Sequence, residues 1–330
     1  MKKAFVTGGT GFIGSHLIEH LIELGVDVTA LIRQRKKWLE GLPIHFVEGD
    51  IRVVESLRES LSQVDTFIHC AAILTGTTQE QLDRVNVQST VALVKEAIDQ
   101  GVETIVVLSS LAALGPSSDG IAVQDNTKAC PVSMYGESKK RMEEALSRLD
   151  LGSSRLIVIR PPAVYGPREE HIFQFFKAGN MRVSPLMGQS KDGSFSIVHV
   201  HDLVIGIAQA AQMNSKVLGA GEIDFFLLSG PKPVKWAELI DATQLALGHS
   251  TFVVPIAPFV LRGLGAILET VGGALGQSPM LNREKAVELS LEWVCSHDKA
   301  TSTFDYQPMM DLQSGVLETV TWYRKHKWMS

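Results

Sequence analysis

Short apolar runs alternate with longer amphipathic runs along the first half of the chain. In the longer runs the apolar residues return every three or four positions, which is the period of one helix face. The short runs have the length and composition of buried strands. Strands alternating with helices are typical of a parallel sheet covered by helices, so we predict an α/β fold with a Rossmann-type, doubly wound parallel sheet. The predicted strands are 4–6, 26–32, 44–47, 66–69, 104–108 and 155–160, and the longest predicted helix is 79–100.

Beyond residue 165 the alternation becomes less regular, and the chain from about residue 248 is predicted to be mostly helical. One strand–helix unit in this part is expected to return to the main sheet. The predicted elements are a helix at 171–178, irregular chain at 181–193, a strand at 195–199, a helix at 200–211, a strand at 224–229 and a helix at 234–247.

Composition narrows the class of protein. The 330 residues are 45% hydrophobic and 20% charged, which is ordinary for a soluble globular protein. The formal net charge of −5 gives no reason to expect a nucleic-acid partner. Three cysteines form no C-x-x-C motif and no cluster with histidine, which favours a reducing compartment and argues against structural zinc, so no metal site is predicted. The chain enters its first strand at once, without room for a signal peptide, and we predict a cytoplasmic protein.

The stretch 252–276 is the most apolar part of the chain. A membrane-spanning helix needs roughly 20 apolar residues with few charges. Arg262, Glu269, two prolines and several glycines interrupt this stretch. We therefore favour a buried helix or a lid over an apolar pocket, and keep an interfacial membrane contact and a membrane span as the alternatives.

A glycine-rich stretch, TGGTGFIGSH at 7–16, follows the first predicted strand and opens the first predicted helix. Gly8, Gly11 and Gly14 have the spacing that allows a tight turn, backbone contact with a pyrophosphate, and close packing of helix on strand. The uncapped N–H groups of the helix then face the anion. We predict a dinucleotide site formed by Gly8, Thr10, Gly11, Phe12, Ile13 and Gly14.

The end of the second strand selects the cofactor. An acidic residue there binds the ribose 2′-hydroxyl of NAD, whereas an arginine accommodates the 2′-phosphate of NADP. Here Ile32 is followed by Arg33 and three further cations at 35–37. We therefore predict NADP(H), with NAD(H) and a merely solvated basic loop as the alternatives.

Two further strand ends are expected to contact the same cofactor. Asp50 could accept from the adenine amino group, with Ile51 packed on the ring. Ala71 and Ala72 are small enough for the backbone to approach the ligand. His69, at the end of its strand, and Asn86, within the long helix, are predicted to be structural rather than catalytic.

Ser110, Tyr135 and Lys139 suit hydride transfer. A ketone that accepts hydride develops negative charge on oxygen and then needs a proton, which a tyrosine can give. An unperturbed phenol has a pKa of about 10. Lys139, one helical turn from Tyr135, would lower that pKa and bind the nicotinamide ribose. Ser110 would donate to the carbonyl oxygen.

The chain resembles the extended short-chain dehydrogenase/reductase family, the group that includes NAD(P)-dependent epimerases and dehydratases. The resemblance rests on the motifs TGGTGFIGSH at 7–16, LSS at 108–110, YGESK at 135–139, RPPAVYGP at 160–167 and HVHD at 199–202. It implies that Ser110 rather than Ser109 is catalytic, and that Pro162, Ala163 and Val164 contact the nicotinamide. It also implies a dinucleotide-binding core at 1–165, to which 196–247 return, and a smaller, mostly helical substrate-binding portion at 166–195 and 248–330.

Within the family, the position of Ala163 separates two groups. Nucleotide-sugar epimerases and dehydratases usually carry asparagine there, whereas the loop in this chain is more similar to 3β-hydroxysteroid dehydrogenase-like and dihydroflavonol reductase-like members. The tail, with Pro279 and REK at 283–285, is also similar to that of steroid dehydrogenase-like members.

We therefore expect an NADP(H)-dependent oxidoreductase acting on a ketone or secondary alcohol of a small hydrophobic substrate. The alternatives are a nucleotide-sugar epimerase or dehydratase with tightly bound cofactor, and a non-catalytic nucleotide-binding member. Family members are often dimers, and the predicted helices 79–100 and 134–149 could form such an interface or could simply pack in the core.

Overall fold

The protein was analysed as a computed structural model, which describes residues 1–74, 78–118, 120–187, 193–257, 259–261, 263, 265–266 and 283–329. Its main body is a seven-stranded sheet in the order β11-β6-β5-β4-β1-β2-β3, and every neighbouring pair is parallel. The strands of this sheet are β1 (Lys3–Thr7), β2 (Asp27–Ile32), β3 (His45–Glu48), β4 (Thr66–His69), β5 (Thr104–Leu108), β6 (Arg155–Arg160) and β11 (Ile223–Leu227).

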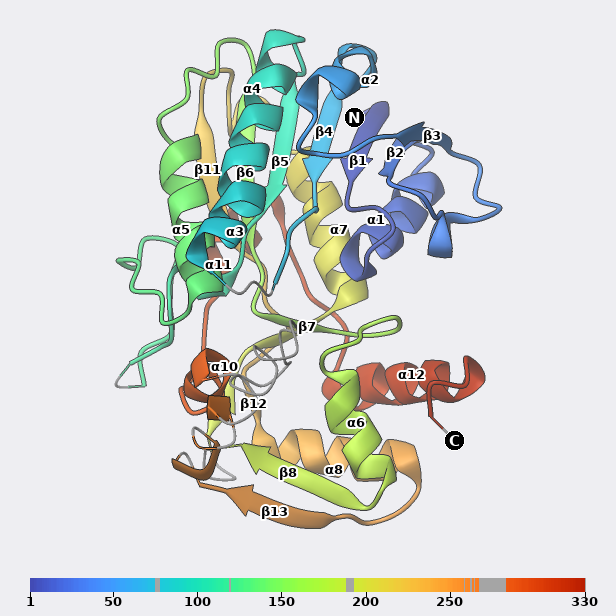
Figure 1. Ribbon diagram of the computed structural model, residues 1–330, viewed down its shortest axis with the longest axis vertical. Coiled ribbons are helices and arrows are strands. Elements are labelled where there is room, and N and C mark those ends of the chain that lie inside the picture. The colour runs from blue at the N-terminus through green and yellow to red at the C-terminus, as the bar shows by residue number, and fades with distance from the viewer. Residues whose placement is uncertain are drawn as a thin grey trace.

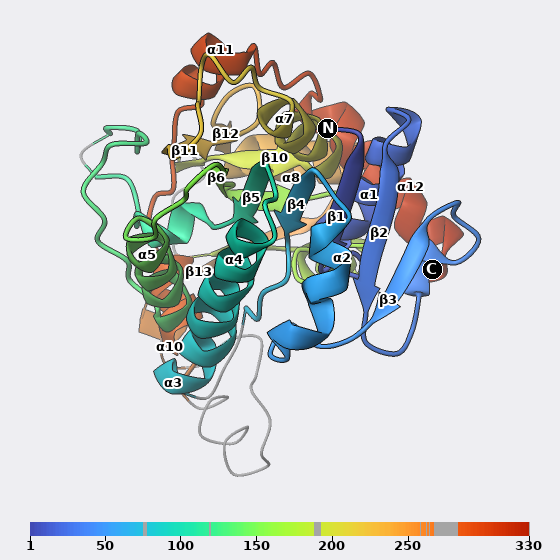
Figure 2. The same ribbon diagram turned by 90° about the horizontal axis from the view of Figure 1, so that it is seen from above.

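Helices cover both faces of this sheet, as Figures 1 and 2 show. Successive residues of a strand point to opposite faces of the sheet, so a sheet covered by helices on both faces has one hydrophobic core on each side. In β5, Val106 belongs to the cluster that contains α1 and α7, whereas Val107 belongs to the cluster that contains α4 and α5. The helices that cover the sheet are α1 (Phe12–Glu23) and α7 (Val200–Ala211) on one face and α2 (Arg58–Ser62), α4 (Thr90–Asp99) and α5 (Met134–Leu146) on the other. The doubly wound fold predicted from the sequence is confirmed.

The apolar faces of α4 and α5 pack inward. Leu93 and Val94 of α4 join Met142 and Leu146 of α5 in one core cluster. These residues therefore stabilise the monomer, and the dimer stays a prediction.

The long helix predicted at 79–100 is divided in the structure. It consists of α3 (Gln79–Leu82), a π-helical segment (Asp83–Ser89) and α4. The wider π-helical turn carries Asn86. Its side-chain oxygen accepts from the N–H of Ile73, and its side-chain nitrogen donates to the carbonyl oxygen of Ile73, both at 2.9 Å. Such bulges in helices frequently occur at functional sites.

A second body of helices and short strands lies below the sheet in Figure 1, and its elements come from the later part of the chain. A cluster of aromatic and aliphatic side chains holds α6, α8 and α12 together. The remaining elements are β7 (Ala163–Tyr165), α6 (Phe173–Asn180), β8 (Val183–Met187), β9 (Ser194–Phe195), β10 (Ile197–His199), β12 (Val234–Lys235), α8 (Trp236–Leu247), β13 (Phe252–Ile256), α10 (Arg283–Glu288), α11 (Asp298–Phe304) and α12 (Leu312–Lys325).

Two predictions for this part are wrong. The chain predicted to be irregular at 181–193 contains β8, which pairs in parallel with β13 at the start of the stretch predicted to be a buried helix or lid. The strand predicted at 195–199 is two strands, β9 and β10, which pair with different partners. These pairings join segments far apart in sequence, so local apolar pattern could not show them. Most of the stretch 257–276, together with Pro279, lies outside the described residues.

Among the described residues, no helix is long and apolar enough to cross a membrane.

Candidate active site

The glycine-rich loop joins β1 to α1 and is shaped by backbone contacts that exclude side chains. Gly8 has a φ of +74°, and a Cβ on it would lie 2.7 Å from the backbone of Cys70 and Ala71. A Cβ on Gly14 would lie 2.3 Å from the carbonyl oxygen of Gly8. The N–H of Gly11 donates to that same oxygen at 2.9 Å. The loop therefore has the close packing that a pyrophosphate cradle at a helix N-terminus requires.

This packing predicts that Gly14→Ala weakens dinucleotide binding by about 10–100-fold. The added methyl would force α1 away from the loop, and overpacking of this kind costs roughly 1–3 kcal/mol. Titration of the purified protein with NADPH, followed by calorimetry, measures the effect. Gly219→Ala is the matched control, because a Cβ there meets its nearest neighbour at an ordinary 3.5 Å. Equal affinities for the two variants would contradict the role of Gly14.

The residues predicted to contact the adenosine half lie at the ends of β2 and β3. Arg33 is exposed and follows β2 directly. Asp50 accepts from the backbone N–H and Nε of Arg52 at 2.9 Å and from its Nη2 at 2.6 Å. These bonds, with a smaller contribution from the nearby Arg33, lower the pKa of Asp50 to about 2. Asp50 is therefore an ionised acceptor at neutral pH, and Ile51 packs beside it against the core.

Ser110 and Tyr135 come together at the carboxyl edge of the sheet. Ser110 follows β5, caps a short 3₁₀ turn and accepts from the N–H of Ala112 at 3.1 Å. Tyr135 is in the first turn of α5, which is capped by Ser133. Ser110 lies close enough to Tyr135 for its side chain to oppose the rise in the pKa of the Tyr135 hydroxyl. The end of β5 and the start of α5 thus bring two hydroxyl groups together, and both could donate to the carbonyl oxygen of a substrate.

Lys139 lies one helical turn below Tyr135 and is almost fully buried. Its Nζ donates to the carbonyl oxygen of Leu108 at 2.7 Å. Burial lowers the pKa of Lys139 to about 8, although the carboxylate of Glu143 opposes the change. Burial also raises the pKa of Tyr135, and the negative charge of Glu288 adds to this, against the opposing effect of Ser110. The net direction of the Tyr135 pKa is therefore upward, contrary to the lowering expected from the spacing of Tyr135 and Lys139.

A buried ion pair supports this arrangement from below. Glu143, on the same face of α5 as Lys139, accepts from Nε and Nη2 of Arg160 at 2.9 and 2.7 Å. It also accepts from the hydroxyl of Ser109 at 2.6 Å. Both charged side chains are only 7% exposed. The pair ties α5 to the ends of β5 and β6, next to Ser110.

His69 and Asn86 have the contacts of structural residues, as predicted. The two ring nitrogens of His69 bond the hydroxyls of Thr7 and Thr90 at 2.7 and 2.9 Å. Burial lowers the pKa of His69 to about 3, so the ring is neutral. Asn86 donates to the hydroxyl of Ser138 at 3.0 Å as well as bonding the backbone of Ile73.

The remaining predicted cofactor contacts are placed separately along the same edge. Ala72 and Ala163 are exposed, whereas Pro162 is buried, and Val164 packs against the core. The loop is fixed by a bond from the N–H of Leu111 to the carbonyl of Pro161 at 2.8 Å.

Two glutamates on α10 were not predicted. Both carboxylate oxygens of Glu284 accept from the N–H of Met134, at 3.1 and 3.2 Å. Glu288 is close enough to Tyr135 to influence the pKa of its hydroxyl. They follow Tyr135 by about 150 positions, so no local motif connects them with the site.

Comparisons with known proteins agree with this architecture. A ceramide reductase of Caulobacter vibrioides is 26% identical over 328 residues, covering 98% of this chain and 95% of that protein. A UDP-glucose 4-epimerase of Vibrio cholerae is 27% identical over 331 residues, covering 96% and 94%. A decarboxylating sterol-4-alpha-carboxylate 3-dehydrogenase of Mus musculus is 23% identical over 341 residues, covering 97% and 90%.

Solved structures show the same fold. The crystal structure of gox2253 superposes with a TM-score of 0.80 at 27% identity and covers 100% of both chains. MoeE5 in complex with UDP-glucose and NAD has a TM-score of 0.77 at 21% identity, covering 98% of this chain and 99% of that one.

The fold and the relatives define an NAD(P)-dependent enzyme of the extended short-chain dehydrogenase/reductase type. The model of the NAD dependent epimerase/dehydratase family matches residues 4–222, and the chain belongs to that family. The resemblance found in the sequence is confirmed.

Proposed function

We propose that the protein is an NADP(H)-dependent reductase or dehydrogenase of a ketone or secondary alcohol on a small hydrophobic substrate. The observation that carries the proposal is that Ser110 and Tyr135 lie close together at the carboxyl edge of the sheet, with the buried Lys139 one turn below. The alternatives from the sequence, a nucleotide-sugar epimerase or dehydratase and a non-catalytic member, share the same loop and are separated by the experiments below.

The glycine loop fits a dinucleotide, because Gly8 and Gly14 leave a cradle that a Cβ would fill. When bound, the nicotinamide supplies or accepts the hydride. The hydroxyl of Ser110 binds the substrate carbonyl oxygen, and Tyr135 gives that oxygen a proton as negative charge develops on it. Lys139 is positioned to bind the ribose and, once drawn from Leu108, to stabilise the phenolate that remains. In alcohol oxidation Tyr135 takes the proton instead.

Two observations support a hydrophobic substrate rather than a nucleotide sugar. Ala163 stands where nucleotide-sugar enzymes of the family carry an amide, so the loop lacks that donor. Two of the relatives are named for lipid substrates, a ceramide and a sterol-4-alpha-carboxylate, whereas the UDP-glucose 4-epimerase supports the alternative.

Cofactor turnover separates the two enzymatic functions. Purified protein with NADPH is offered a panel of long-chain and cyclic ketones, and absorbance reports NADPH consumption. We expect net oxidation of NADPH with apolar ketones and no interconversion of UDP-sugars. Tightly held cofactor, without net turnover on ketones but with conversion of a UDP-sugar, would overturn the proposal in favour of the epimerase.

The choice of NADP(H) rests on Arg33. Arg33→Ala is expected to raise the Michaelis constant for NADPH by about 10–100-fold, because a charge-assisted bond to phosphate is worth roughly 1.5–3 kcal/mol. The constant for NADH should change little. Arg148→Ala, an exposed arginine near the other end of α5, is the control for a general loss of positive charge. Equal effects of Arg33→Ala on both cofactors would contradict the 2′-phosphate role.

A further inference from the structure

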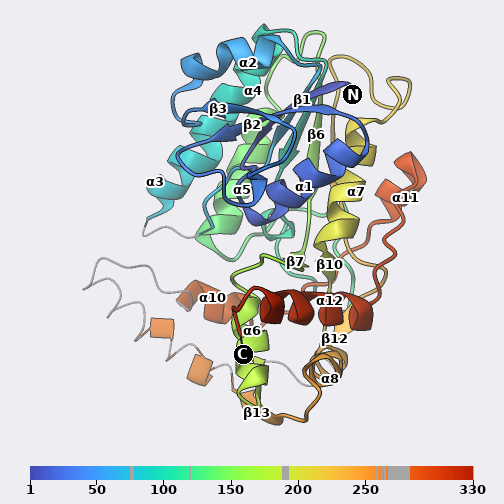
Figure 3. The ribbon, with the colours of Figure 1, turned by 90° about the vertical axis from the view of Figure 1, so that its right-hand side faces the viewer.

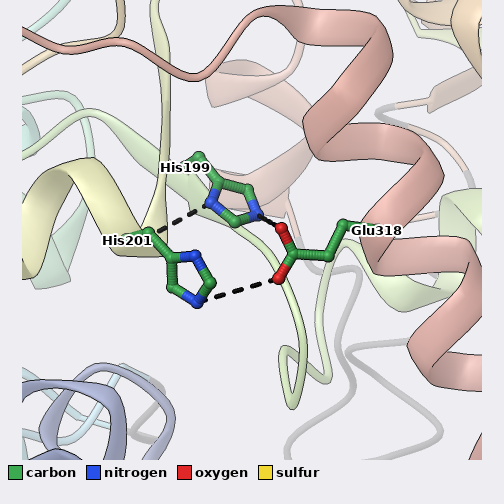
Figure 4. A group of neighbouring side chains, drawn as sticks. All are labelled: His199, His201 and Glu318. Carbon is green, nitrogen blue, oxygen red and sulfur yellow. Dashed lines mark hydrogen bonds and ion pairs between the residues drawn. The ribbon is translucent and has the colours of Figure 1, made fainter. Parts of the chain in front are cut away.

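Two histidines and a glutamate, none of which belongs to the candidate active site, lie close together where α7 meets α12 (Figure 4). His199 ends β10 and caps α7, and His201 is in the first turn of α7. Glu318 is in the middle of α12, about 120 residues later. Figure 3 shows α12 running beneath the lower end of α7.

The spacing of the three side chains is too wide for hydrogen bonds. Glu318 Oε2 lies 4.0 Å from Nε2 of His199, and Glu318 Oε1 lies 3.7 Å from Nε2 of His201. One donor atom from each residue falls within 4.8 Å of the others. Ligands about 2.0–2.1 Å from a tetrahedral zinc ion are about 3.4 Å apart, so a small inward movement would bring these atoms to coordinating positions.

His199 supplies an independent sign of a missing partner. Its side chain is fully buried, and its Nε2 has no hydrogen-bond partner in the described part of the chain. Buried polar atoms are nearly always paired, so this atom calls for one. The other two side chains are 44% and 37% exposed, which leaves an open side through which an ion and a water ligand could enter.

Coordination through Nε2 requires that the ring proton of His199 lie on Nδ1. That proton would face the backbone N–H of His201, which donates to Nδ1 at 3.4 Å in this structure. Two N–H donors would then oppose each other, so coordination through Nε2 requires the His199 ring to turn away from this N–H; the contact given up, at 3.4 Å, is longer than an ordinary N–H hydrogen bond. His16 is not one of the group, although its ring centroid lies 5.7 Å from that of His201.

We propose that His199, His201 and Glu318 form a binding site for a divalent transition-metal ion of the zinc class. Two imidazoles and one carboxylate suit Zn²⁺ or Co²⁺, whereas Mg²⁺ prefers oxygen ligands. The ion would link α7 of the sheet body to α12 of the lower body. It is not needed for the proposed hydride transfer, so its loss changes stability rather than the chemical step. The absence of a cysteine motif therefore did not exclude a metal site, because its ligands come from a pair of histidines and a distant glutamate.

The test is a titration of tag-free, chelator-treated protein with ZnCl₂ by calorimetry, repeated with CoCl₂ by absorbance. We expect one ion per chain at micromolar affinity, a thermal midpoint raised by several degrees in excess zinc, and no effect of MgCl₂. The cobalt spectrum should lack the charge-transfer band of a thiolate ligand, which would reveal binding at Cys130, the exposed cysteine.

Glu318→Gln and His201→Gln are the informative variants, because both side chains are partly exposed and their replacement leaves the core intact. Each should weaken zinc binding at least about 100-fold, since even the loss of a group that only supports a ligand costs 10–100-fold. His45→Gln is the control, as His45 forms an exposed pair with Asp27 at 3.5 Å without a second histidine. No zinc binding by the wild type, or equal binding by Glu318→Gln and His45→Gln, would overturn the site and leave the proposed reductase unaffected.

Discussion

Replacing Tyr135 by phenylalanine is expected to lower kcat for ketone reduction by about 10²–10⁴-fold, the usual contribution of a positioned proton donor. The ring stays in place, but no group then gives a proton to the substrate oxygen. Because α5 and the glycine loop are separate elements, dissociation constants for NADPH should change little. Steady-state kinetics together with a calorimetric titration measure both quantities.

The chain offers a matched control in Tyr323, whose buried hydroxyl donates to the carbonyl of Glu169 at 2.7 Å, far from Ser110. Tyr323→Phe removes a similar hydroxyl and should lower stability by about 1 kcal/mol without affecting kcat. An unchanged kcat in Tyr135→Phe would reject the catalytic assignment and favour a non-catalytic nucleotide-binding protein.

Replacing Glu143 by alanine is expected to destabilise the protein by about 3–5 kcal/mol, a large share of the 5–15 kcal/mol that keeps a typical domain folded. The substitution leaves the guanidinium of Arg160 buried without its counter-ion, and it removes the acceptor of the Ser109 hydroxyl. Urea unfolding at neutral pH measures the loss. If the alanine variant does not fold, Glu143→Gln, which keeps the shape and one acceptor, should show a smaller loss.

The large loss of stability expected for Glu143→Ala comes from the burial of the ion pair rather than from its hydrogen-bond geometry. A second, exposed ion pair tests this explanation. Arg58 and Glu96 also form a two-bond pair, at 2.7 and 3.3 Å, but the Arg58 side chain is 58% exposed. Glu96→Ala should cost at most about 1 kcal/mol. Similar losses in Glu96→Ala and Glu143→Ala would show that desolvation is not the deciding factor.

The sheet could be predicted from the sequence because each of its strands is recognisable from its own few residues. Each strand is a short apolar run, and the two cores follow from alternation along strands such as β5. The glycine loop could be predicted for a similar reason, since the steric demand at Gly14 arises from the carbonyl of Gly8 only six residues earlier. The prediction that Ser110 and Tyr135 act together needed one further inference. In a parallel sheet covered by helices, strands end and the following helices begin at the same edge, so both residues were expected there.

Other features depend on contacts between distant segments. The pairing of β8 with β13 brings together residues about 70 positions apart, and each strand carries a proline, which weakens the local signal for a strand. Glu288 reaches Tyr135 from a separate body, and its charge opposes the phenolate that the Y-x-x-x-K spacing was expected to favour. The cluster of His199, His201 and Glu318 likewise exists only once α12 is placed beside α7.

The tryptophan that follows the basic loop has a consequence for exchanging segments between relatives. Trp38 packs edge-on against Trp322 of α12 at 5.5 Å between ring centroids, and the guanidinium of Arg168 lies 5.2 Å from its ring. The loop after Arg33 therefore packs against the carboxyl-terminal helix α12 as well as against the sheet. A chimera that takes this loop from a relative must also bring a compatible partner for position 322, or the transplanted loop will be displaced from the position at which we propose that it contacts the cofactor.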